Sequence, residues 1–164
     1  MSFSDRDVMY VQNPAIGAAL LWRFVCGYYS NENRPVPFPL LFVVLPIGFC
    51  QDLCTVIKGT QKASGLSKVS EKLFSGKQND SIHYVNATAI QMRELTLEAF
   101  NIAVEANLVV MSAETATVFP MVTTFRKYTP KGDCKDMMNA AEKLGAWCSG
   151  LTLLEIAKWL KVRF

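Results

Sequence analysis

The chain has 164 residues, 51% of them hydrophobic and 19% charged, which predicts one folded domain over residues 1–164 and excludes intrinsic disorder. The formal net charge of +3 is too small to indicate nucleic-acid binding by itself. The apolar share exceeds what a small domain conceals easily, so we expect a protein partner to cover part of the surface.

The cysteines and the apolar segments indicate the compartment. Five cysteines are an odd number without the spacing of a disulfide framework, so we expect free thiols in a reducing cytosol. The first residues, Met1–Asp7, contain no basic leader followed by an apolar stretch. The most apolar run, 38–50, is about half as long as a membrane span. We therefore expect a cytoplasmic protein without membrane contact.

The first predicted elements are helical. Asn13 is a good N-cap and Pro14 suits the first helical position, which predicts a helix over 15–29 that ends in a polar loop. The apolar run over 40–47 has no periodicity that separates a strand from a buried helix. We favour a short helix kinked at Pro46.

Short helices are expected next over 52–58, broken by Gly59, and over 66–74, closed by Gly76. The longest helix is expected over 81–105, which contains neither Gly nor Pro, and apolar residues spaced by three and four along it form a seam. Leu97 and Val104 extend the apolar character around the second half of this helix. We expect that half to be covered on most sides.

The pattern then changes to that of a β-hairpin. Residues 108–111 and 115–119 predict two short strands around a turn. Helices are expected over 135–147 and 151–160, and the second begins at a capping box formed by Thr152 and the Glu three residues later.

These elements predict a mainly α fold. Short helices, a longer helix and then a β-hairpin follow one another as in a winged helix-turn-helix. We therefore expect a winged-helix-like centre over 36–120, with flanking helices over 13–30 and 133–164.

A lysine segment, residues 58–77, is the first candidate site. It holds five lysines against one acid, Glu71. The candidates for DNA contact are Lys58, Lys62, Lys68, Lys72 and Lys77. In a winged helix they would lie near the DNA backbone, and contact without base-reading residues would be tolerant of sequence and sensitive to salt. The alternative is a solvated face whose lysine stems cover apolar surface.

Large aromatic residues of the terminal helices are the second candidate site. Tryptophan is enriched at the centres of protein interfaces, so these residues could anchor a partner. The candidates are Trp22, Tyr28, Trp147, Trp159 and Phe164. Packing in the core of the domain itself is an equal alternative.

The remaining polar residues indicate no chemistry. Cys50, Cys54 and His83 could be three zinc ligands, but the fourth is missing, and small buried cysteines are the simpler interpretation. A pairing of any cysteine with the single histidine as a nucleophile is equally weak. Glu94 and Glu98 form a charged strip that we expect to act in salt bridges. We assign no catalytic residue, metal or cofactor.

Several segments together resemble one family. They are Asn13–Ala15, Ala19–Val25, Gly27–Tyr29, Pro39–Pro46, Met92–Thr96, Ala141–Trp147 and Ile156–Arg163. These segments are similar to the middle component of bacterial three-component ABC-ATPase systems, the group that includes Lamassu-type defence.

The resemblance implies a non-enzymatic small subunit without a cofactor. Such a subunit associates with an SMC- or RecN-like ABC ATPase and with an effector, a nuclease or other toxic subunit, that is restrained until phage or plasmid DNA is detected. The short turn at 112–115 disfavours a wing that inserts into DNA and favours protein binding. We thus expect an adaptor that joins the ATPase to the effector. Any contact that it makes with DNA is expected to be with the DNA backbone.

Two other functions stay open from the sequence. One is a free-standing winged-helix regulator that binds DNA. The weaker one is a cysteine-dependent enzyme that uses His83.

Overall fold

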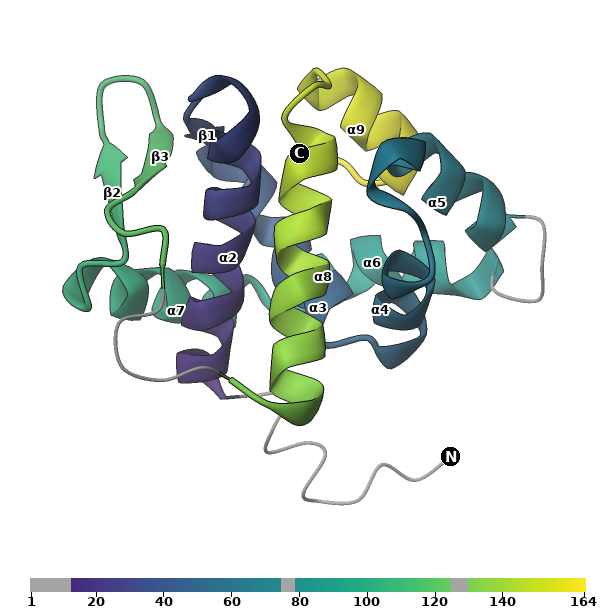
Figure 1. Ribbon diagram of the computed structural model, residues 1–164, viewed down its shortest axis with the longest axis horizontal. Coiled ribbons are helices and arrows are strands. Elements are labelled where there is room, and N and C mark those ends of the chain that lie inside the picture. The colour runs from purple at the N-terminus through teal and green to yellow at the C-terminus, as the bar shows by residue number, and fades with distance from the viewer. Residues whose placement is uncertain (1–12, 75–78, 125–129) are drawn as a thin grey trace.

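The chain is mainly α, as predicted, with a small antiparallel sheet at one end (Figure 1). A computed structural model describes residues 13–74, 79–124 and 130–164, apart from the side chains of residues 74 and 79–84. The helices are α2 (Pro14–Glu32), α3 (Val44–Gly48), α4 (Gln51–Lys58), α5 (Gly65–Phe74), α6 (Asn79–Gln91), α7 (Arg93–Glu105), α8 (Gly132–Cys148) and α9 (Leu153–Leu160). Two 3₁₀ helices, η1 (Phe38–Val43) and η2 (Lys62–Ser64), and three strands, β1 (Val36–Pro37), β2 (Val109–Ser112) and β3 (Thr117–Pro120), complete the described elements.

Helices α2 and α8 form the centre of the molecule and lie side by side along their length (Figure 1). A Cβ added at Gly27 would lie 2.0 Å from the Glu142 carbonyl oxygen, and one added at Gly145 would lie 2.1 Å from that of Phe24. The two backbones therefore touch at positions where only glycine fits. The segments predicted to flank the fold thus contain its central pair, and the segment 36–120 packs around them.

The predicted start of α2 is confirmed. Asn13 Oδ1 accepts from the Ala15 N–H at 2.9 Å, and Pro14 occupies the first position of the helix. The predicted end is wrong, because the helix continues through Ser30 to Glu32. The Asn31 amide donates to the Ala146 carbonyl at 2.9 Å and so ties the last turn to α8.

The long helix predicted over 81–105 is interrupted at Met92, whose backbone (φ −90°, ψ 9°) leaves the helical region. Helix α7 packs on α2, whereas α6 packs on α3, η1 and α5. Packing against these different surfaces accounts for a break that no Gly or Pro announces. The Met92 N–H donates to the Thr88 carbonyl and the Thr96 N–H donates to the Met92 carbonyl, both at 2.8 Å, so one bond closes α6 and the other opens α7.

The predicted hairpin is confirmed and has a third strand beside it. The sheet order is β1-β3-β2, with Val118 between Val36 and Met111. Strand β1 is only two residues long and contains a proline, so no alternating pattern predicts it. Residues 40–47 belong to η1 and α3, so Pro46 lies inside a short helix, as predicted, and the change of helix type falls at Val44.

The capping box at α9 is confirmed. Thr152 Oγ1 accepts from the Glu155 N–H at 3.2 Å, and Glu155 Oε2 accepts from the Thr152 N–H at 2.8 Å. No single helix among the described residues is long and apolar enough to cross a membrane. Phe38–Gly48 and Gln51–Lys58, which are bent by 100° to each other, are long and apolar enough only when taken together.

Candidate interaction surfaces

The lysine segment is tied to its neighbours by several interactions. Lys58 Nζ lies 2.9 Å from Asp136 Oδ2 of α8, and Lys68 Nζ lies 2.9 Å from Glu71 Oε2 one turn along α5. Both pairs are exposed, so each adds little to stability and leaves the lysines accessible. Lys62 is also exposed, whereas Lys77 lies outside the described residues.

Two lysines stabilise the C-terminal end of α4. Lys72 Nζ donates to the Gly59 carbonyl at 3.1 Å and to Thr60 Oγ1 at 3.0 Å. Lys143 Nζ, from α8, donates to the carbonyls of Ile57 at 3.2 Å and Thr60 at 2.9 Å. The last carbonyls of a helix have no partner within it, and cations suit its negative end. Lys72 therefore has a structural role that sequence reasoning missed.

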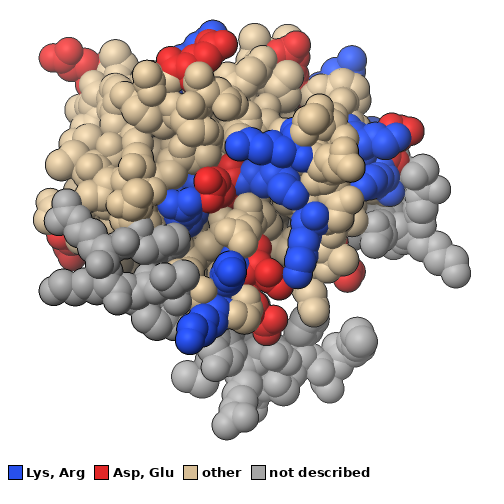
Figure 2. All heavy atoms as spheres, viewed as in Figure 1, with Lys and Arg blue, Asp and Glu red and all other residues tan. Residues whose placement is uncertain are grey.

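Charge is unevenly distributed over the surface. Figure 2 shows Lys and Arg side chains gathered over the middle and right of one face, where α4, α5 and α8 lie. The side that carries the hairpin is formed mostly by uncharged residues with some Asp and Glu. The lysine segment carries a net charge of +4, from five Lys and one Glu.

Most of the predicted aromatic anchors are core residues. Trp22, Tyr28 and Trp147 are buried. Trp22 Nε1 donates to the Val122 carbonyl at 2.6 Å, and Trp147 Nε1 donates to that of Lys62 at 2.8 Å. The alternative of packing within the domain therefore holds for these three, since little of each ring is left for a partner.

Trp159 and Phe164 are more accessible. Trp159 is half-buried and lines a shallow surface groove of about 470 Å³ between α5, α8 and α9. Phe164 is 48% exposed at the end of the chain.

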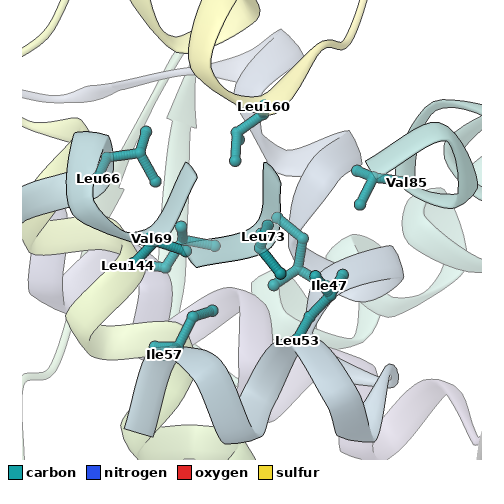
Figure 3. A pocket seen from close by; sticks show the side chains of 9 residues that line it. All are labelled: Ile47, Leu53, Ile57, Leu66, Val69, Leu73, Val85, Leu144 and Leu160. Carbon is teal, nitrogen blue, oxygen red and sulfur yellow. The ribbon is translucent and has the colours of Figure 1, made fainter. Parts of the chain in front are cut away.

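The interior offers no room for a substrate at its small cavity. Figure 3 shows nine apolar side chains that surround it, from α3, α4, α5, α6, α8 and α9. The cavity measures about 10 Å³ and its wall has no polar surface. A water molecule needs polar partners as well as space, so this is a small packing void in the core.

The five cysteines are free thiols. Burial raises the pKa of Cys54 and Cys148 to about 12 and that of Cys26 to about 11. Burial also raises the pKa of Cys50. Such thiols stay protonated at neutral pH, and the protonated form is a poor nucleophile and metal ligand.

No metal centre forms within the described part of the chain. Cys50 and Cys54 lie near each other at the start of α4, but no three His, Cys, Asp or Glu side chains there are grouped to hold an ion. The side chain of His83 lies outside the described residues.

An exposed apolar stripe runs along α6 and α7. It consists of Ile90, Leu97 and Val104, which are 73%, 39% and 38% exposed. Leu97 and Val104 are spaced by seven, or nearly two helical turns, and so lie on one face of α7, whereas Ile90 lies at the end of α6. We expected Leu97 and Val104 to be covered. That prediction is wrong, because the described part of this chain leaves both exposed. The buried face of α7 lies opposite and packs on α2 and η1.

Acidic side chains run beside the apolar stripe. Glu94, Glu98 and Glu105 follow at intervals of four and seven on the exposed side of α7, and we call them the acidic ridge. The salt bridges expected for Glu94 and Glu98 do not form within the parts of the chain that the structure describes. Among the described residues the ridge therefore has no cationic partner, and it is exposed as a negative strip.

The hairpin beyond α7 continues the same character. Val110 and Met111 are exposed on β2, and Glu114 lies in the turn. Residues 93–124 carry one Arg and four Glu, a net charge of −3 in a chain whose total is +3. The lysine segment and the α7–hairpin face thus have opposite charge.

The whole chain, residues 1–164, matches the family model of the ABC-three component (ABC-3C) system Middle Component 3. The chain belongs to this family. No curated protein and no solved structure matches it. The resemblance inferred from the helix patterns is thereby confirmed, and the chain is a middle component of a three-component ABC system.

The apolar stripe is what sequence reasoning missed in this middle component. The spacing of Ile90, Leu97 and Val104 is visible in the sequence, but the whole helix is apolar on several sides. Only the packing of α7 against α2 shows which apolar residues are left exposed.

Proposed function

We propose that this middle component is a non-catalytic adaptor that joins the ABC ATPase of its system to the effector subunit. The observation that carries the proposal is the apolar and acidic face formed by α7 and the hairpin. A helix and hairpin in this order are the parts of a winged helix that approach DNA. Here the acidic ridge would repel phosphate groups, and the exposed apolar side chains favour a protein partner.

The arrangement of residues 36–120 supports a winged-helix-like centre that binds protein through its α7–hairpin face. A strand, a set of helices and a hairpin follow in order, and β1 pairs with the second strand of the hairpin. The helix before the hairpin, α7, lacks basic residues after Arg93. The lack of positive charge favours the adaptor over a free-standing winged-helix regulator that binds DNA.

Co-expression with the neighbouring gene products tests the adaptor. We expect the tagged middle component to retain the ATPase and the third component together after purification, with and without ATP. Recovery of the subunit as a monomer under both conditions, with the other two components soluble, would refute the proposal. Tight binding of a specific DNA sequence by the isolated subunit would point to the regulator instead.

A second role, contact with the DNA backbone, is supported by the basic face. Lys58, Lys62 and Lys68 are exposed on α4, η2 and α5. Figure 2 shows Lys and Arg side chains gathered where α4 and α5 lie. Such contact would be independent of sequence and would weaken steeply with salt. We expect the assembled complex with all three lysines changed to Gln to bind duplex DNA more weakly and with a smaller salt dependence. An unchanged affinity and salt slope would exclude this role.

A cysteine-dependent enzyme is disfavoured by the raised pKa values of Cys26, Cys54 and Cys148. Activity that disappears in His83→Ala while the complex still assembles would restore that hypothesis.

A further inference from the structure

We propose that the apolar stripe and the acidic ridge together form the docking site of a basic amphipathic helix that belongs to another component of the system. This inference rests on the proposed adaptor function and names the surface and the partner chemistry that the adaptor uses. The stripe supplies apolar contacts, and the ridge selects the charge of the helix that makes them.

The geometry of the stripe fits a helix better than an extended strand. Leu97 and Val104 lie on one face of α7, and at 1.5 Å per residue they are about 10 Å apart along its axis. Ile90 lies at the end of α6, before the break at Met92, and adds a third exposed apolar side chain near the start of α7. A partner helix with apolar residues spaced by three and four places one of them beside each member of the stripe.

The acidic ridge decides the charge of the partner. Glu94, Glu98 and Glu105 lie beside the stripe and have no cationic partner in the described part of the chain. Lysine or arginine residues next to the apolar positions of a docked helix would face these carboxylates. Such pairs at the rim of an interface steer association and select the correct partner more than they add affinity.

The same charges exclude other occupants. A second copy of this chain, docked antiparallel through the same face, would bring one acidic ridge against the other. DNA and anionic membrane surfaces carry the same sign as the ridge and would be repelled. A basic helix is the occupant that satisfies both the apolar stripe and the ridge.

Photo-crosslinking in the co-expressed three-component complex tests the site. A photoreactive p-benzoylphenylalanine is placed at Leu97 in one preparation and at Leu154 in another. Leu154 is a matched control because it is a leucine on a helix, 81% exposed, but lies on α9. We expect the adduct of position 97 to map to a segment of the ATPase or the effector with apolar residues at helical spacing and Lys or Arg between them.

Three outcomes would overturn the inference. They are an adduct to an acidic or uncharged segment, an adduct within the chain itself or to a second copy, and an intact complex with no adduct at position 97. Because assembly is observed in the same preparation, failure of the docking site is distinguished from failure of the adaptor function. In the latter case no complex forms at all.

Affinity measurements provide the second arm. The double variant L97D/V104D should weaken binding to the other components by about tenfold or more, while L154D leaves it unchanged. The triple variant E94K/E98K/E105K should also weaken binding. In this variant the affinity for the other components should no longer decrease as the salt concentration rises. All these positions are exposed, and thermal unfolding checks that each variant stays folded. Wild-type affinity in L97D/V104D would refute the site.

Discussion

The contact between α2 and α8 predicts that Gly27→Ala destabilises the fold strongly. The added Cβ would lie 2.0 Å from the Glu142 carbonyl oxygen, a backbone atom that cannot rotate away. Contact at normal distances requires the two helices to move apart by about 1 Å or more. Gly145→Ala meets the Phe24 carbonyl in the same way from the other helix.

The expected magnitude follows from two opposing effects. Alanine in the middle of a helix is favoured over glycine by about 1 kcal/mol. Overpacking of a well-packed contact costs about 1–3 kcal/mol, and separation of these helices also loosens buried side chains such as Phe24 and Leu144. A clash with backbone takes the upper end of that range, so we expect the free energy of unfolding to fall by about 2 kcal/mol or more, a large part of the stability of a small domain.

Urea denaturation followed by circular dichroism measures this effect. Gly150→Ala is the matched control, because nothing lies within 4 Å of its added Cβ, and its stability should change by less than about 0.5 kcal/mol. A Gly27→Ala protein as stable as the wild type would show that the two helices do not pack as closely as described.

Three further predictions concern stability. Thr152→Ala removes the capping box of α9 and should lower the free energy of unfolding by about 1 kcal/mol; an unchanged urea midpoint would contradict the cap. Lys143→Met removes the donor at the end of α4 and should lower it by about 1–2 kcal/mol, whereas Lys62→Met should have no effect; equal effects of the two would contradict the capping role. The raised pKa values of Cys54 and Cys148 mean that the folded chain keeps protons that the unfolded chain loses near pH 9. Stability should therefore fall as the pH rises from 9 to 12, by up to about 1.4 kcal/mol per pH unit for each thiol. Cys148→Ala should reduce this slope in urea titrations at each pH, and an equal slope would show that the thiol is not buried as described.

Local signals in the sequence predicted local structure well. Asn13 with Pro14, and Thr152 with the Glu three residues later, defined helix starts because a cap needs only a few neighbouring residues. The glycine after α4 and the two short strand-like runs of the hairpin were equally informative. The mainly α class followed from these elements.

Features that depend on distant packing could not be predicted. The sequence contains no mark of the break at Met92, because it results from the different surfaces beneath α6 and α7. The exposure of Leu97 and the burial of Trp22 and Trp147 also depend on which elements pack together. Gly27 and Gly145 lie far apart in the sequence, so their meeting at the centre of the fold is visible only in three dimensions.

Hydrogen–deuterium exchange of the free subunit and of the assembled complex tests the central claim most directly. If α7 and the hairpin form the partner surface, the amides of residues 93–112 should exchange about tenfold or more slowly in the complex, while those of the lysine segment keep their free rates in the absence of DNA. Unchanged exchange of α7 in a complex that has formed, with protection elsewhere, would contradict the claim that its exposed apolar face binds the other components.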